Sequence, residues 1–460
     1  MHTAIRRRAD CRAVFGAPGL RLITAIGLVF SLASAQVLAQ SQSPTVVELF
    51  SKDIEAQVAS HYARTEALYK DLHAHPEMGF EEVATARKLA AEMRGLGFEV
   101  TEGVGKTGVV AMLRNGAGPT ILVRTELDAL PMEEKTGLPF ASKVKAVFQG
   151  KETFVAHSCG HDLHMASWVS TARTLVALKD RWQGTLMFVA QPAEELVSGA
   201  KAMLADGLYQ RFGKPDVAFG LHTAPSAYGQ IGLLAGPATS NSDGVELVFK
   251  GRGGHGSAPD KTIDPVLIAA RFVVDVQSVV SREKDPFAFG VFSVGAIHGG
   301  SVGNIIPDSV TLNGTIRSYS AEVRQRLQDG IRRTAKGVAL MAGAPEPDVR
   351  IAAGGDAIVN DAALVSRTEA VFKSAFGAAN VQRVPPITAS EDFSEFINAG
   401  VPGMFFFVGV YDPKDLEAAS KPGGKPLAFN HSPFFAPVPE SSIKTAVKAM
   451  SLAVLTALQR

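Results

Sequence analysis

The sequence predicts an α/β protein whose mixed sheet is covered by helices, with an inserted ferredoxin-like βαββαβ domain. Three observations support this fold class. Short apolar runs bounded by Gly, Pro and Asn alternate with segments whose apolar residues recur every three or four positions. The middle of the chain follows a different order, β-α-β-β-α-β. After an N-terminal leader, about 420 residues remain, which is enough for two domains.

The first part of the larger domain is predicted to cover residues 45–235. Its expected helices are 51–70, 81–94 and 163–178. Its expected buried strands are 108–113, 120–124, 185–190 and 216–221. Strands that alternate with helices in this way form a sheet covered on both faces. In such sheets functional groups collect where strands end, and His161, Glu194, Glu195 and His222 all follow strand-like or turn segments.

The inserted domain is predicted over residues 236–354. Its expected elements are strand 244–250, helix 264–283, strands 287–297 and 309–319, helix 321–341 and strand 347–352. Residues 355–460 return to the pattern of the first domain, with an apolar strand at 403–408 and an amphipathic helix at 441–458.

Residues 1–39 are predicted to be a secretory signal peptide. Arginines at positions 6, 7, 8, 12 and 21 precede the apolar stretch 22–33, and small-residue cleavage options follow it. We therefore expect a periplasmic or secreted protein. No later stretch is expected to be long enough to span a bilayer, so no stable membrane span should remain after the leader is removed.

The composition and net charge of the chain limit the classes of partner that it can bind. Hydrophobic residues make up 46% of the chain and charged residues 20%, and the formal net charge is +1. Nothing in this balance favours nucleic acid or an acidic membrane surface, so a small-molecule substrate fits better.

A candidate metal site lies in the run 154–162 and the segment 191–195. These segments combine a thiol, imidazoles and paired carboxylates, which are the groups that a metal-dependent hydrolase uses. Cys11 falls in the leader, so Cys159 would be the only thiol of the mature protein, with no partner for a disulfide. A buried apolar cysteine is the alternative, but its position two residues from His161 favours a metal ligand.

Seven stretches resemble the M20 metallopeptidases, in the amidohydrolase branch that includes hippurate hydrolase and the auxin-conjugate hydrolases. The stretches are 72–80, 124–132, 157–164, 191–195, 221–222, 253–259 and 304–308, and the last is followed by the related segment 314–317. The resemblance covers nearly the whole chain after the leader, in the same order. It implies a zinc-peptidase-like catalytic domain with an inserted lid or dimerisation domain.

The same resemblance implies a site with two divalent metal ions per subunit. The implied ligands are Cys159, His161, Glu195, His222 and His431. Imidazoles, a carboxylate and a thiolate suit zinc, and the family also admits manganese, cobalt or nickel. Wider relatives place a bridging Asp where this chain has Cys159.

Further roles follow from the resemblance. It implies that Glu194 is the general base and proton shuttle, and that Asp128 orients a ligating imidazole. A turn-capping carboxylate is the alternative for Asp128. His255, often reaching the site of a second subunit, would stabilise the oxyanion, and Asn304 would donate nearby. Arg317 would hold a substrate carboxylate, or else be an exposed strand cation. A homodimer through the inserted domain is therefore expected.

These expectations define a metal-dependent amidohydrolase that cleaves N-acyl amino acids or related amide conjugates. A dipeptidase or carboxypeptidase with the same metal chemistry is the enzymatic alternative. A protein that binds metal or conjugates without catalysis is the other alternative, and Glu194 argues against it because a binder needs no base.

Overall fold

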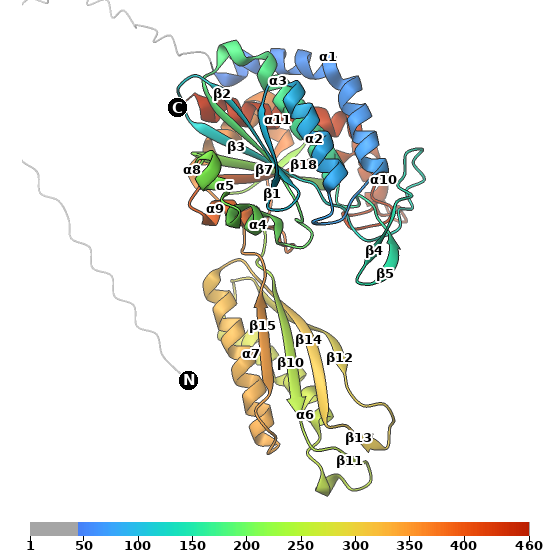
Figure 1. Cartoon of the computed structure of the whole chain (residues 1–460). Coiled ribbons are helices and arrows are strands. Elements are labelled where there is room, and N and C mark those ends of the chain that lie inside the picture. The colour runs from blue at the N-terminus through green and yellow to red at the C-terminus, as the bar shows by residue number, and fades with distance from the viewer. Residues whose placement is uncertain (1–44, 460) are drawn as a thin grey trace, which may run out of the picture. The chain divides into compact units, whose positions relative to one another are not determined.

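The computed structural model describes residues 45–459 (Figure 1). The signal-peptide prediction for residues 1–39 and Cys11 lie outside the described residues. The described chain begins with the long helix α1 (Val46–Ala74), whose first turn is closed by a capping box between Thr45 and Glu48.

A mixed eight-stranded sheet forms the frame of the catalytic part, as predicted. The strand order is β1-β2-β6-β3-β7-β18-β8-β17. The strands are β1 (Glu99–Val104), β2 (Gly108–Asn115), β3 (Thr120–Glu126), β6 (Gly184–Gln191), β7 (Val217–Ala227), β8 (Ile231–Leu233), β17 (Val381–Arg383) and β18 (Gly403–Tyr411). Strand β3 is parallel to both β6 and β7, and β7 is parallel to β18. Strand β2 pairs antiparallel with both β1 and β6.

Helices cover both faces of this sheet, which explains why its strands read as continuous apolar runs. One face packs against α1, α2 (Val83–Gly95), α3 (His161–Ala177), α8 (Ala362–Phe376) and α11 (Pro439–Leu458). The other face packs against the shorter helices α4 (Gly199–Ala205), α5 (Leu208–Phe212) and α9 (Ser394–Asn398). Along β18, Met404 and Phe406 enter the first core, whereas Phe405 and Phe407 enter the second.

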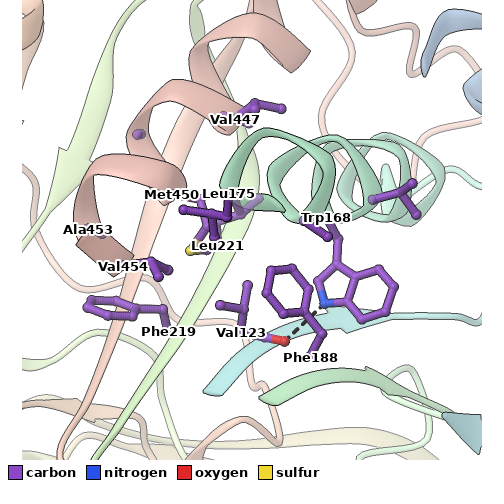
Figure 2. Close-up of a cluster of buried hydrophobic side chains, with 14 of the residues drawn as sticks. Val123, Trp168, Leu175, Phe188, Phe219, Leu221, Val447, Met450, Ala453 and Val454 are labelled. Carbon is purple, nitrogen blue, oxygen red and sulfur yellow. Dashed lines mark hydrogen bonds between the residues drawn. The ribbon is translucent and has the colours of Figure 1, made fainter. Parts of the chain in front are cut away.

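The larger core joins α3 and α11 to the sheet (Figure 2). Trp168 of α3 packs edge-on against Phe188 of β6, and its indole nitrogen donates to the carbonyl of Val123 at 2.9 Å. Because the buried indole N–H has a partner, this large side chain fixes α3 on the sheet without a desolvation penalty. The position of α3 matters because its first residue belongs to the site described below.

Helix α11 is 20 residues long and apolar enough to cross a membrane, and 78% of its most apolar window is buried inside the protein. The prediction that no later stretch has sufficient length was therefore wrong. The helix is apolar nearly all round because it lies in the core between α1, α3 and α8.

A second, four-stranded sheet is formed by the part of the chain between β9 (Gly236–Pro237) and β16 (Val359–Asn360). These two short strands pair with each other. Its elements are β10 (Asp243–Lys250), α6 (Pro265–Asp275), β12 (Gly290–His298), β14 (Ser309–Ser318), α7 (Ala321–Met341) and β15 (Asp348–Ala353). The strand order β12-β14-β10-β15, antiparallel throughout, is that of a ferredoxin-like fold. The sheet shares its own apolar core with α6 and α7. The limits 236–354 remain a prediction.

Three smaller elements complete the description. A hairpin joins β4 (Lys145–Phe148) to β5 (Lys151–Phe154), and α10 (Pro413–Ser420) precedes the segment that leads to α11. A ribbon of β11 (Gly254–His255) and β13 (Ile305–Ile306) extends from the inserted sheet. Figure 1 shows this ribbon at the end of the insert opposite the connections to the large sheet.

Candidate metal centre

The register of the parallel strands brings the predicted metal ligands to one edge of the large sheet. Glu126, the last residue of β3, pairs with Gln191, the last residue of β6. Glu194 and Glu195 follow directly in the turn after β6. His222 is not at a strand end as predicted, because β7 continues to Ala227. Strands β3 and β7 pair from Ile121–Val217 to Val123–Phe219, and the same offset continued along both strands would place His222 opposite Glu126.

Two further ligands come from loops. Cys159 precedes Gly160, whose φ of 91° turns the chain into α3. Helix α3 therefore begins at His161, two residues before the predicted start, and His161 occupies its first turn. His431 comes from the loop before α11, where its amide donates to the carbonyl of Ser158 at 2.8 Å. The backbone of His431 has a left-handed φ of 67°.

All five predicted ligands come together. Cys159 Sγ lies 3.3 Å from His222 Nε2, and His431 Nε2 lies 3.4 Å from Glu195 Oε2. Cys159, His161 and His222 form one group whose donor atoms lie within 4.8 Å of one another. Cys159, Glu195 and His431 form a second such group. Because the two groups share Cys159, these five residues would hold two divalent ions, which would supply Lewis-acid chemistry to a bound amide.

The hydrogen bonds of His161 and His222 leave the Nε2 atoms of both rings free to bind a metal ion. Nδ1 of His161 donates to the backbone carbonyl of Asp128 at 2.8 Å, and Nδ1 of His222 donates to the carbonyl of Thr223 at 2.8 Å. These bonds leave both Nε2 atoms as lone-pair donors. His161 Nε2 and Glu195 Oε1 are buried and have no hydrogen-bond partner among the described residues. Such atoms carry a desolvation cost that a bound cation would remove, so the donor set fits a metal site.

Asp128 supports the site in a different way from the one predicted. Its carbonyl, and not its carboxylate, accepts from His161, because the closest carboxylate oxygen is 3.6 Å from Nδ1. The carboxylate instead accepts the amide of Glu195 at 2.9 Å. Asp128 therefore contacts two of the predicted ligands, one through its backbone and one through its side chain.

Glu194 lies beside the ligands without belonging to either group. Its Oε2 is 3.7 Å from His161 Nε2, and 6% of the residue is exposed. Burial, together with the charges of Glu391, Glu195 and Asp392, raises the pKa of Glu194 well above its usual range.

The charges around the site favour a cation. The buried Arg124 contacts Glu126, Glu391 and Asp392, so one guanidinium faces three carboxylates. Glu194 adds a fourth carboxylate nearby. Burial alone would lower the pKa of His161, but the Asp128, Glu126 and Glu195 carboxylates raise it to about 10. Burial and the charges of Glu195, Glu194 and Glu126 also raise the pKa of the Cys159 thiol. A divalent cation would reverse both tendencies and leave neutral imidazole and thiolate as ligands.

A layer of supporting residues around the ligands was not predicted from the sequence. Nδ1 of His164 is 3.0 Å from Glu126, and its Nε2 accepts the amide of Thr223 at 2.9 Å. Glu391 and Asp392, which bind Arg124, received no role either. Two adjacent acids followed by a phenylalanine, in a chain segment that leads to a buried strand, were the available signal.

A cavity of about 660 Å³ opens at the ligands. Its apolar wall consists of Val197, Ile387, Phe405, Phe407 and Phe429. Arg317 of β14 also lines it and donates to Ser390 Oγ at 3.1 Å. Within residues 45–459, no carboxylate lies within salt-bridge distance of Arg317, so its guanidinium can still pair with a carboxylate.

His255 and Asn304 do not line this cavity. His255 is exposed on β11, and the carbonyl of Asn304 accepts the amide of Gly256 across the ribbon. The described chain thus brings seven of the ten predicted site residues to the metal centre or its support, and Arg317 to the cavity wall. The roles of His255 and Asn304 remain predictions that require a second copy of the chain.

The fold and the donor set define a metal-dependent hydrolase of amide bonds with a site for two ions. The sequence model of Peptidase family M20/M25/M40 matches residues 122–455, and the chain belongs to this family.

Two relatives and one solved structure illustrate the similarity. Hippurate hydrolase of Campylobacter jejuni is 39% identical over 72% of this chain and 84% of its own length. Thermostable carboxypeptidase 2 of Saccharolobus solfataricus is 36% identical over 75% of this chain and 85% of its own length. The YXEP protein of Bacillus subtilis, described as a dinuclear metal-binding peptidase of the M20 family, has a TM-score of 0.71 and 28% identity. This last alignment covers 87% of this chain and 99% of that one.

Proposed function

We propose that this protein hydrolyses the amide bond of N-acyl amino acids or closely related conjugates. The observation that carries the proposal is the place of Glu194. This buried carboxylate lies 3.7 Å from His161 Nε2 and lines a cavity that also contains Arg317, which forms no salt bridge within residues 45–459. The similarity to hippurate hydrolase supports the same substrate class, because hippurate is an acylated amino acid.

The five donor residues would hold two divalent ions, with Cys159 shared between them. Zinc or manganese is the proposed metal, and cobalt or nickel also suits these ligands. A thiolate combined with imidazoles favours the softer metals of this set. When bound, the ions polarise the amide carbonyl and make the attacking water more acidic.

Glu194 performs the proton transfers. Its carboxylate accepts a proton from the attacking water as the new C–O bond forms at the amide carbon. The protonated side chain then donates this proton to the amine nitrogen as the C–N bond breaks. Burial and neighbouring acids favour the protonated form of Glu194, which is the form required for the second step.

Different parts of the cavity wall would bind the two ends of the substrate. Arg317 is placed to bind the α-carboxylate of the amino acid, since a guanidinium recognises a carboxylate through two parallel hydrogen bonds. Phe405, Phe407 and Ile387 offer an apolar surface for the acyl group.

The proposal is tested with metal-stripped protein reconstituted separately with zinc and manganese. N-acetyl, N-benzoyl and long-chain acyl amino acids and simple dipeptides are supplied, and the released amino acid is measured. We expect turnover of acyl amino acids in preference to dipeptides. Metal uptake without turnover of any amide would overturn the proposal and leave a binding protein.

A peptidase is the second candidate. The similarity to thermostable carboxypeptidase 2 supports it, because that name denotes an enzyme that cleaves peptides. Turnover of peptides but of no acyl amino acid would establish this alternative.

We also propose a periplasmic or secreted homodimer that pairs through the inserted domain. The arginine-rich and apolar segments within residues 1–39 support export. The exposure of His255 on a ribbon away from its own cavity supports a role for that residue in a partner's site.

A further inference from the structure

The turn that carries Glu194 and Glu195 has a strained and tightly packed backbone. Ala193 and Val197 have left-handed φ values of 48° and 49°, which residues with a Cβ rarely adopt. A Cβ placed on Gly199 would lie 1.5 Å from the carbonyl oxygen of Pro192, so only glycine closes this turn. Strained conformations of this kind persist when the surrounding structure holds them in place.

Two buried carboxylates hold the amides on either side of Glu194. The amide of Glu195 donates to Asp128, as described above. The amide of Ala193 donates to Oε1 of Glu82 at 2.8 Å. Glu82 is 111 residues away in sequence and follows the segment 72–80, to which no catalytic task has been assigned. The backbone that bears Glu194 is therefore held at both ends by acidic side chains.

Glu82 is an unusual residue to find in this position. None of its surface is exposed, and no lysine, arginine or histidine of residues 45–459 lies within salt-bridge distance. Its second carboxylate oxygen accepts from the hydroxyl of Thr107. Burial raises the pKa of Glu82 to about 7. A buried carboxylate without a cation is costly, and this cost is reduced only by the hydrogen bonds that it accepts.

Helix stability does not explain Glu82. It occupies the N-cap position of α2, but its side chain caps no amide of that helix. Glu77 performs that task, since its carboxylate accepts the amides of Ala84 at 3.1 Å and Thr85 at 2.7 Å. The Glu82 carboxylate is directed at Ala193 instead.

The close packing of Gly79 places segment 72–80 against the turn that carries Glu194. A Cβ on Gly79 would lie 3.2 Å from both Cα and Cβ of Ala193 and 3.0 Å from Leu196 Cδ1. The backbone before α2 thus contacts Ala193 directly, and Glu82 adds a hydrogen bond to this contact.

We propose that Glu82 is a positioning residue for amide hydrolysis. It fixes the backbone at Ala193, so that Glu194 faces the cavity and Glu195 faces the metal site. The inference rests on the proposed function, in which Glu194 moves the proton. Glu82 itself contacts no substrate or reacting atom.

The test compares Glu82→Ala and Glu82→Gln with Glu81→Ala. Glu81 is the matched control, because it has the same side chain one residue earlier, is exposed, and makes no side-chain hydrogen bond within the described chain. The measurements are kcat and KM, the ions retained per chain during dialysis against a chelator, and amide hydrogen exchange of segment 191–199.

We expect Glu82→Ala to lower kcat about ten- to a hundredfold with little change in KM, because a slight displacement of the base slows the reaction. Exchange at Ala193 should rise, and ions should be lost faster. Glu82→Gln should recover most of each property, since its carbonyl oxygen can still accept the amide of Ala193. Glu81→Ala should match the wild type.

A second variant guards against loss of folding. Thr107→Val leaves Glu82 in place but removes its other partner, and it should change kcat and exchange in the same direction by a smaller amount. Unchanged exchange and kcat in both Glu82→Ala and Thr107→Val would overturn the inference. A wild type that turns over no amide would refute the proposed function, whereas exchange and ion retention would still decide the role of Glu82.

Discussion

Cys159 Sγ lies 3.3 Å from His222 Nε2, a contact between two atoms that would both serve as ligands of one ion. The same sulfur belongs to the group formed with Glu195 and His431. Cys159 therefore belongs to both groups of candidate ligands. Its replacement should affect both ions at once, which distinguishes it from a ligand of one ion.

We predict that Cys159→Ala lowers metal content below one ion per chain, while Cys159→Asp retains two ions and binds manganese better relative to zinc. A carboxylate can bridge two cations as a thiolate does, but it is a harder ligand. Elemental analysis after dialysis in an equimolar zinc and manganese buffer measures both effects. Normal metal content in Cys159→Ala would show that the sulfur is only a buried apolar group.

Glu194 and Glu195 are adjacent, but they should respond differently to substitution. Glu194→Gln should keep both ions and lose about a hundred- to ten-thousandfold in kcat, because only a proton carrier is removed. Glu195→Ala should lose metal as well as turnover, because its carboxylate contacts His431 within one donor group. Metal analysis beside steady-state kinetics separates the two residues. Equal metal loss in both variants would contradict the assigned division of roles.

Local apolar patterns predicted the two sheets, whereas the five candidate ligands were implied by the resemblance to the M20 family. Apolar runs identify buried strands, and side chains placed after parallel strands meet at one edge. His222 entered the candidate set through the same resemblance, and β7 continues past it to Ala227, which the predicted strand 216–221 did not include.

The supporting residues could not be found in this way. The bond between Glu82 and Ala193, and the contacts of Arg124 with Glu391, join segments that are far apart in sequence. No local period encodes such pairs. The choice of the Asp128 carbonyl over its carboxylate depends on a difference of less than 1 Å, which only the folded chain determines.

Arg317 should contribute to substrate binding through charge. Arg317→Ala is expected to raise KM about tenfold or more for acyl amino acids, in line with the loss of a hydrogen bond to a charged group. The matched control is the same substrate with its carboxylate converted to an amide, for which KM should hardly change. An unchanged KM for the free carboxylate would identify Arg317 as a bystander bonded to Ser390.

His255 should act in the site of a partner subunit. His255→Ala and Glu194→Gln homodimers are each expected to be nearly inactive. Mixed dimers, formed by unfolding and refolding the two variants together, should regain activity, because one site then contains both intact residues. Mixing Glu194→Gln with itself is the control. Failure of the mixture to recover activity, with dimers confirmed by light scattering, would exclude this role.

The stability of the inserted sheet should fall in acid because of Asp243. This residue begins β10, and its carboxylate accepts from Arg324 Nε at 2.9 Å and from Gln328 at 2.8 Å. Burial alone would raise the pKa of Asp243, but these hydrogen bonds and the Arg324 charge lower it below the ordinary value. A lowered carboxylate pKa stabilises the fold above the unfolded-state pKa of about 3.9, and this contribution is lost as the pH falls through the folded value.

Asp243→Asn should therefore lower the free energy of unfolding by about 1–3 kcal/mol at pH 7 and by less at pH 3. Denaturant titrations at both pH values measure the difference, with Asp348→Asn on the exposed edge strand β15 as the control. A loss of equal size at the two pH values would show that the Asp243 charge contributes nothing to this contact.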